Sequence, residues 1–142
     1  MNRTSALALA AACLLFTAAP RWSQEKQEAG RARISIYSAV PGKQLDLLKW
    51  LAAREEVARE AGVPPARLYA HLDGEGWDYL VLWPLTTPEQ DRRMDELAAK
   101  KGLKTGFASS LEFRALLDRH SDTLAAGPTT AAELVTSASA GR

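Results

Sequence analysis

The sequence has little of the chemistry that most metal and redox sites need: one cysteine, two histidines and one asparagine in 142 residues. The cysteine, Cys13, lies in an N-terminal segment with the features of an export signal. Once that segment is removed, the chain has no disulfide, no thiol nucleophile and no cysteine-ligated metal. The two histidines and scattered carboxylates match no recognised ligand spacing, so we expect no dedicated metal site. No stretch has the spacing of a phosphate loop, and nothing specifies a flavin or nicotinamide cofactor.

The first nineteen residues have the three regions of a secretory signal peptide. Arg3 supplies the positive charge, residues 6–16 form an apolar run, and residues 17–19 are small. The run is shorter than the roughly 20 residues that cross a membrane. We therefore expect export to the periplasm or the outside, with cleavage between residues 19 and 24. Cys13 follows three alanines, which leaves a lipoprotein signal as the alternative.

The exported chain is electrically balanced. Removal of Arg3 with the signal leaves 17 basic and 17 acidic residues. This balance argues against nucleic acid or an anionic membrane as a partner. The remaining chain, about 120 residues, is long enough to bury the core of one domain without disulfides.

The pattern of apolar residues predicts an alternation of strands and helices. The predicted strands are residues 33–40, 67–72 and 77–85, with a short fourth at 121–125. The longest helical pattern runs from Lys43 to Ala61, where Gly62 ends it. Three pairs have the spacing of a helix capping box: Thr87 with Gln90, Ser109 with Glu112, and Thr130 with Glu133. His120 is expected at the end of the helix that Ser109 begins, as a charge favourable to the helix dipole.

This order, β-α-β-β-α-(α)-β, predicts an α+β fold of the ferredoxin-like split βαβ type. We expect an antiparallel sheet with its helices on one face. The predicted parts are the signal peptide (1–19), a linker (20–31), the ferredoxin-like domain (32–127), and a C-terminal helical turn with a frayed tail (128–142).

Two stretches carry a family resemblance: YSAVPGKQLDLLKW at 37–50 and LYAHLDGEGWDYLVLWP at 68–84. With the element order, they resemble the dimeric α/β-barrel superfamily over about residues 31–125. That superfamily includes the antibiotic-biosynthesis monooxygenases, haem-degrading monooxygenases and NIPSNAP-type proteins. The resemblance implies a homodimer paired sheet to sheet, with a ligand pocket between sheet and helices or within the barrel. The haem-degrading members use an Asn-Trp-His set, from which this chain departs because its one asparagine is Asn2.

The hairpin at residues 67–85 predicts one aromatic and one aliphatic face, because side chains alternate along a strand. We expect a three-residue loop, with Gly76 in the positive-φ conformation of a bulge, which places His71 opposite Tyr79. The rings would then share one face, and aliphatic residues such as Leu80 would pack beneath the helices. A two- or four-residue loop would instead place His71 opposite Asp78.

We expect the aromatic face to be an interface or a ligand surface, since a large exposed patch of rings is typical of either. His71 is the candidate acid/base residue because histidine titrates near neutrality; the alternative is a structural histidine in an interface. The predicted ligand-binding residues are Tyr37, Tyr69, His71, Trp77, Tyr79 and Trp83.

Three functions remain open from the sequence. The first is an exported protein that binds a small apolar or aromatic molecule as a binding or accessory protein. The second is a cofactor-independent monooxygenase, in which a phenolic substrate itself reduces oxygen. The third is a structural dimerisation module whose aromatic face is consumed by self-association.

Overall fold

The computed structural model describes residues 30–74 and 76–141, which form four strands and four helices. The strands are β1 (Gly30–Ala39), β2 (Arg67–Ala70), β3 (Tyr79–Pro84) and β4 (Leu117–Gly127). The helices are α1 (Gln44–Glu60), α2 (Pro88–Lys100), α3 (Gly106–Arg114) and α4 (Ala131–Ala140). The predicted signal peptide and residues 20–29 of the predicted linker lie outside the described residues.

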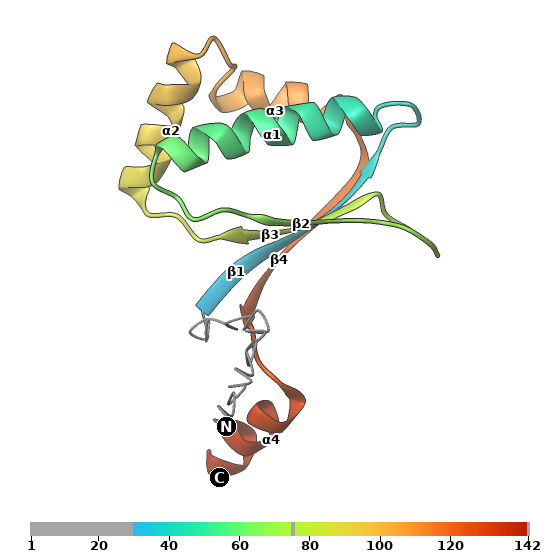
Figure 1. Ribbon diagram of the computed structural model, residues 1–142, viewed down its shortest axis with the longest axis vertical. Helices are drawn as coiled ribbons and strands as arrows, with labels where there is room; N and C mark the ends of the chain where they lie inside the picture. Colours follow the sequence, from blue (N-terminus) through green and yellow to red (C-terminus); the bar gives the residue numbers. More distant parts are fainter. Residues whose placement is uncertain (1–29, 75, 142) are drawn as a thin grey trace, which may run out of the picture.

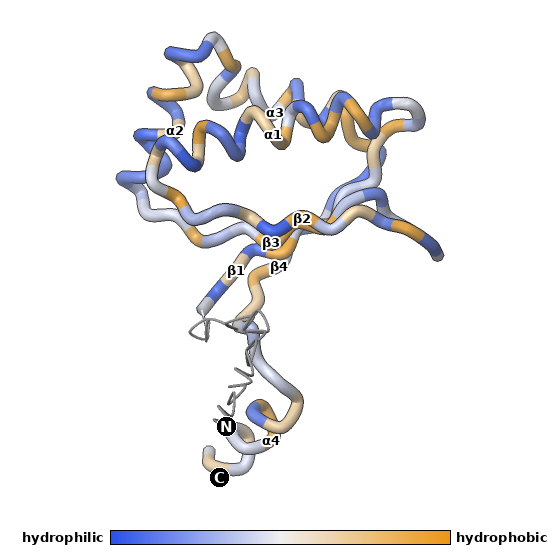
Figure 2. The backbone as a smooth tube through the Cα atoms, viewed as in Figure 1, coloured by the Kyte–Doolittle hydropathy of each residue, from blue (hydrophilic) through white to orange (hydrophobic). Residues whose placement is uncertain are grey.

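The strands form one antiparallel sheet in the order β2-β3-β1-β4. Helices α1, α2 and α3 lie on one side of this sheet, and the other side is open (Figure 1). The order of the elements and of the strands in the sheet confirms the predicted ferredoxin-like α+β fold. Hydrophilic residues predominate in α2, whereas the strands carry many hydrophobic residues (Figure 2).

The core lies between α1 and the central strands. The buried side chains of α1 are Leu47, Leu51 and Val57, spaced along one side of the helix. Opposite them, the sheet contributes Tyr37 from β1 and Val81 from β3, both at most 5% exposed. The helix therefore contributes aliphatic side chains to the core, and the sheet contributes aromatic rings as well.

The expected assignment of the two sheet faces is wrong. Tyr37, Tyr79 and Trp83 lie on the helix side, and the first two are buried. Leu80 and Leu82 alternate with them and lie on the open side, where they are half-buried. The alternation of side chains along a strand divides them into two sets, but it does not determine which set the helices cover. In this fold the aliphatic side of α1 packs against the rings.

The expected hairpin register is also wrong, by one residue. Ala70, rather than His71, is opposite Tyr79, and the backbone N–H of His71 donates to the carbonyl of Asp78 over 2.9 Å. This is the register expected for an even-numbered loop. Tyr69 is opposite Leu80, so Tyr69 and His71 lie on the open side of the sheet.

Asp78 gives a physical reason for this register. Its backbone N–H donates to the carbonyl of Tyr37 over 2.8 Å, and its carboxylate accepts from the N–H of Ala39 over 2.6 Å. These contacts with β1 fix the start of β3, and they determine the register even where the loop sequence favours another loop length. Gly76 has the expected positive φ, at 108°.

Two of the three predicted capping boxes are confirmed, those of Thr87 at α2 and Thr130 at α4. The box predicted for Ser109 is wrong, because α3 begins at Gly106 and Ser109 lies inside it. Thr105 takes the N-cap position with extended backbone angles, but its side chain makes no capping hydrogen bond.

The C-terminal part is more ordered than the sequence pattern suggests. β4 is 11 residues long and pairs with β1 from Gly30 to Ala39, so His120 lies in a strand opposite Tyr37 rather than at a helix end. Beyond β4, α4 is a helix of ten residues instead of a turn with a frayed tail. All its described side chains are exposed, and it lies apart from the other helices (Figure 1).

Candidate ligand pocket

A cavity of about 680 Å³ lies between the helix side of the sheet and the helices. Its floor is formed by residues of β1, β3 and β4, and its roof by the second half of α1. Residues 63–66 and the first turns of α2 complete the wall. This volume is within the range of small-molecule sites, roughly 300–1,000 Å³.

Four aromatic side chains from four different elements form much of the apolar surface of the pocket. Trp50 stacks on Phe113 with ring centroids 4.5 Å apart, and Phe113 meets the Tyr37 ring edge-on at 5.6 Å. Trp83 reaches the same group because its indole N–H donates to the Tyr37 hydroxyl over 3.1 Å. The rings of α1, α3, β1 and β3 therefore hold each other in place around one cavity.

A line of polar groups crosses the floor of the pocket from β3 to β4. Trp83 donates to the Tyr37 hydroxyl over 3.1 Å, and Ser35 lies two residues before Tyr37 on the same side of β1. Ser35, only 1% exposed, donates to Oδ1 of Asp122 over 2.6 Å. Since an ionised carboxylate only accepts hydrogen bonds, the line ends at Asp122.

This environment keeps Tyr37 protonated. Burial raises the pKa of the Tyr37 phenol above its usual value of 10.0, and the charge of Asp122 acts in the same direction. The hydrogen bond from Trp83, the nearby hydroxyl of Ser35 and the charge of Arg33 oppose this rise without cancelling it. The phenol is therefore a neutral polar group at ordinary pH.

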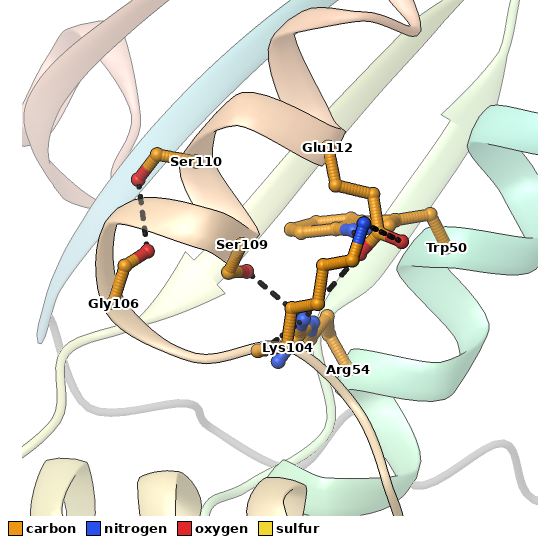
Figure 3. Close-up of polar contacts among 7 residues, drawn as sticks. All are labelled: Trp50, Arg54, Lys104, Gly106, Ser109, Ser110 and Glu112. Carbon is orange, nitrogen blue, oxygen red and sulfur yellow. Dashed lines mark hydrogen bonds and ion pairs between the residues drawn. The ribbon is translucent and has the colours of Figure 1, made fainter.

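A polar cluster joins α1 to α3 behind the aromatic wall (Figure 3). The Arg54 guanidinium donates to the carbonyl of Lys104 over 2.6 Å and to Ser109 Oγ over 2.9 Å. It also lies 4.9 Å from the centre of the Trp50 ring. Glu112 accepts from the Trp50 indole N–H over 3.2 Å and lies 4.0 Å from Arg54. These contacts fix the orientation of the Trp50 ring in the pocket wall.

The pocket gathers only part of the predicted site. Of the six predicted ligand-binding residues, Tyr37 and Trp83 line the cavity. Tyr79 is buried in the core beside it, where its hydroxyl donates to the carbonyl of Gln44 over 3.4 Å. The other three, Tyr69, His71 and Trp77, are outside the lining.

His71 is part of the hairpin instead. Its ring lies 5.0 Å from that of Trp77, and its Nε2 is in hydrogen-bond contact with the carbonyl of Asp73. This position gives His71 no contact with the pocket.

Sequence reasoning missed several pocket residues. Trp50 and Phe113 are apolar residues of helices, and Ser35 and Asp122 are polar residues of strands, so none of the four was predicted as a site residue. The residue types gave a weak signal, since serine facing an aspartate across β1 and β4 can be recognised only when the pairing is known. Within residues 30–74 and 76–141, no group of three or more His, Cys, Asp or Glu side chains could hold a metal ion. No helix of the same residues is long and apolar enough to cross a membrane.

No family model matches this chain, and no curated protein matches it either. Solved structures are similar to parts of it. One is described as an uncharacterized NIPSNAP domain protein from Burkholderia xenovorans, with 16% identity and a TM-score of 0.44 over 71% of this chain and 96% of that one.

Two further structures are described as dimeric ferredoxin-like proteins. The protein from Thermobifida fusca, of unknown function, has 15% identity and a TM-score of 0.45 over 71% of this chain and 93% of its own. The protein from an uncultured marine organism has 11% identity and a TM-score of 0.45, over 72% and 90% of the two chains.

Proposed function

We propose that this chain is an exported protein that binds a small molecule in the pocket between its sheet and its helices. The observation that carries the proposal is the cavity of about 680 Å³ with its wall of four rings and its line of polar groups. An apolar wall with a few polar groups is the usual form of a small-molecule site. The rings supply contact area, while Tyr37 and Asp122 offer polar contacts that can orient a ligand.

An uncharged fluorophore tests this function. N-phenyl-1-naphthylamine becomes bright when it enters an apolar site, so the purified protein should bind it with a saturable signal. Native mass spectrometry of the same preparation should reveal any molecule carried through purification. A signal that does not saturate at one molecule per chain contradicts the proposal.

The open side of the sheet supports a second part of the proposal, a homodimer. Ile34, Ile36, Leu80 and Leu82 form an aliphatic patch across β1 and β3, on the side without helices. An apolar patch of this kind is stabilised when a second surface covers it, and the same patch on a second copy is complementary in chemistry. Self-association there leaves the pocket on the other face free, so the dimer and the binding function are compatible.

A cofactor-independent monooxygenase is the second candidate, and the Asp122 carboxylate in the pocket lining favours it. A carboxylate can take up a proton from a phenolic substrate, a role that His71 cannot fill from outside the pocket. Incubation with polyphenols under oxygen should then give quinones, measured by absorbance. No oxygen consumption above the rate without protein would exclude this candidate and leave the binding protein.

Export is the remaining part of the proposal, and it rests on the sequence of residues 1–19. The intact mass of the product secreted by a bacterial host should correspond to a chain that begins between residues 20 and 25. A mass that retains Met1, or one increased by lipid at Cys13, contradicts it.

A further inference from the structure

The charges around the pocket are unbalanced. Three arginines and five carboxylates line it. Arg59 is paired with Glu56 over 2.7 Å, so these two charges compensate each other. The Arg54 guanidinium lies 4.0 Å from Glu112, which also pairs with the Lys104 ammonium over 3.6 Å, so Glu112 is shared between two cations.

Apart from the Arg59–Glu56 pair, carboxylates outnumber arginines in the lining by four to two. The carboxylates are Glu55, Asp91, Asp95 and Asp122, and the arginines are Arg33 and Arg54. Within the described part of the chain, none of these four carboxylates forms an ion pair. The pocket therefore has an excess of negative charge in a chain that is nearly neutral as a whole. A cleft lined by one sign of charge attracts ligands of the opposite sign.

Asp122 is the carboxylate best placed to hold a cation. It lies on the floor of the pocket, and its Oδ1 accepts from the buried hydroxyl of Ser35 over 2.6 Å. No hydrogen bond to its Oδ2 is formed by the residues that the structure describes. A carboxylate fixed through one oxygen presents the other to a ligand without losing its orientation.

The aromatic wall favours the same class of ligand. The faces of tryptophan and tyrosine rings attract cations, and such rings with a nearby carboxylate form the usual site for an ammonium group. Trp83, Tyr37 and Asp122 all line the same cavity, as does Ser35, which donates to Asp122. The rings and the carboxylate are therefore open to the same ligand.

We propose that the ligand of this pocket is an organic amine that binds as its ammonium form. The ammonium group donates to Asp122, and the apolar body of the ligand packs against Trp83 and the other rings. Glu55, Asp91 and Asp95 increase the local concentration of cations at the rim. This inference rests on the proposed function and adds the chemical class of the ligand.

Displacement of bound N-phenyl-1-naphthylamine tests the inference with three probes that share one ring. 3-Phenylpropylamine is cationic at neutral pH, 3-phenylpropanol is neutral, and 3-phenylpropionate is anionic. The amine should displace the fluorophore at a roughly tenfold lower concentration than the alcohol, because a charge-assisted hydrogen bond is stronger than a neutral one. The carboxylate should be the weakest of the three.

Asp122→Asn should bring the amine to the level of the alcohol, because the amide keeps the shape and an acceptor for Ser35 but loses the charge. Asp118→Asn is the matched control: it lies on β4 outside the lining and should keep the full preference.

An amine no better than the alcohol, or a carboxylate that displaces best, overturns the inference while fluorophore binding still supports the pocket. If the fluorophore itself does not bind, the proposed function fails and this inference fails with it.

Discussion

Replacing Tyr79 with aspartate should unfold the domain, whereas replacing the adjacent Leu80 should leave the fold intact and dissociate the proposed homodimer. Tyr79 is 8% exposed and faces α1, and its hydroxyl bonds to Gln44. Burial of a tyrosine removes roughly 150 Å² or more from water, which at about 25 cal/mol per Å² is worth about 4 kcal/mol. A buried carboxylate adds a further penalty. The total is comparable with the whole stability of a small domain, about 5–15 kcal/mol.

Leu80 is on the open side, so a carboxylate there stays in water in the monomer and should change its free energy of unfolding by less than about 1 kcal/mol. In a symmetric dimer the change occurs twice, and two buried carboxylates should raise the dissociation constant at least a hundredfold, by roughly 3 kcal/mol. Circular dichroism measures folding, and light scattering at micromolar concentration measures the mass. A folded Tyr79→Asp variant beside an unfolded Leu80→Asp variant would mean that the two faces have been exchanged.

Three further predictions concern the stability of the monomer. The pKa of Tyr37 is higher in the folded protein than in the unfolded chain. As pH rises, the unfolded chain therefore loses this proton first. The stabilising contribution of Tyr37 is thus complete below about pH 10 and lost as pH rises through the folded pKa. Tyr37→Phe should therefore lose less stability than the wild type between about pH 9 and about pH 11 in urea titrations; an equal loss contradicts this. Thr87→Ala should lower the free energy of unfolding by about 1 kcal/mol through the lost capping box, while Thr130→Ala, at the exposed α4, should leave it unchanged. Arg54→Ala should lower it by about 1–2 kcal/mol, because the carbonyl of Lys104 loses its donor; urea midpoints equal to wild type would show that the α1–α3 cluster contributes nothing.

The element order could be predicted from the sequence because each element has a local signal. Pro88 after Thr87 begins α2, and Gly102 follows its end, so local chemistry was sufficient there. The length of β4 could not be predicted, since its polar residues are exposed and its pairing with β1 joins residues far apart in the chain.

Predicting the site required two facts that local sequence patterns do not contain. One is which face of the sheet the helices cover, and the other is the register of the hairpin, which contacts between Asp78 and β1 determine. Both were predicted wrongly, and the errors placed Tyr69 and His71 in the pocket. Tyr37 and Trp83 were still identified, because alternation along each strand is a local property.

The most direct test of the account compares two tryptophans only six positions apart in the sequence. Trp83 lines the pocket between sheet and helices, whereas Trp77 packs against His71 in the hairpin, outside the lining. Both variants, Trp83→Ala and Trp77→Ala, are titrated with N-phenyl-1-naphthylamine after circular dichroism has established that they are folded. Trp83→Ala should weaken binding by about 1–3 kcal/mol, and Trp77→Ala should leave it unchanged. Weaker binding in Trp77→Ala alone would place the ligand at the hairpin and contradict the pocket.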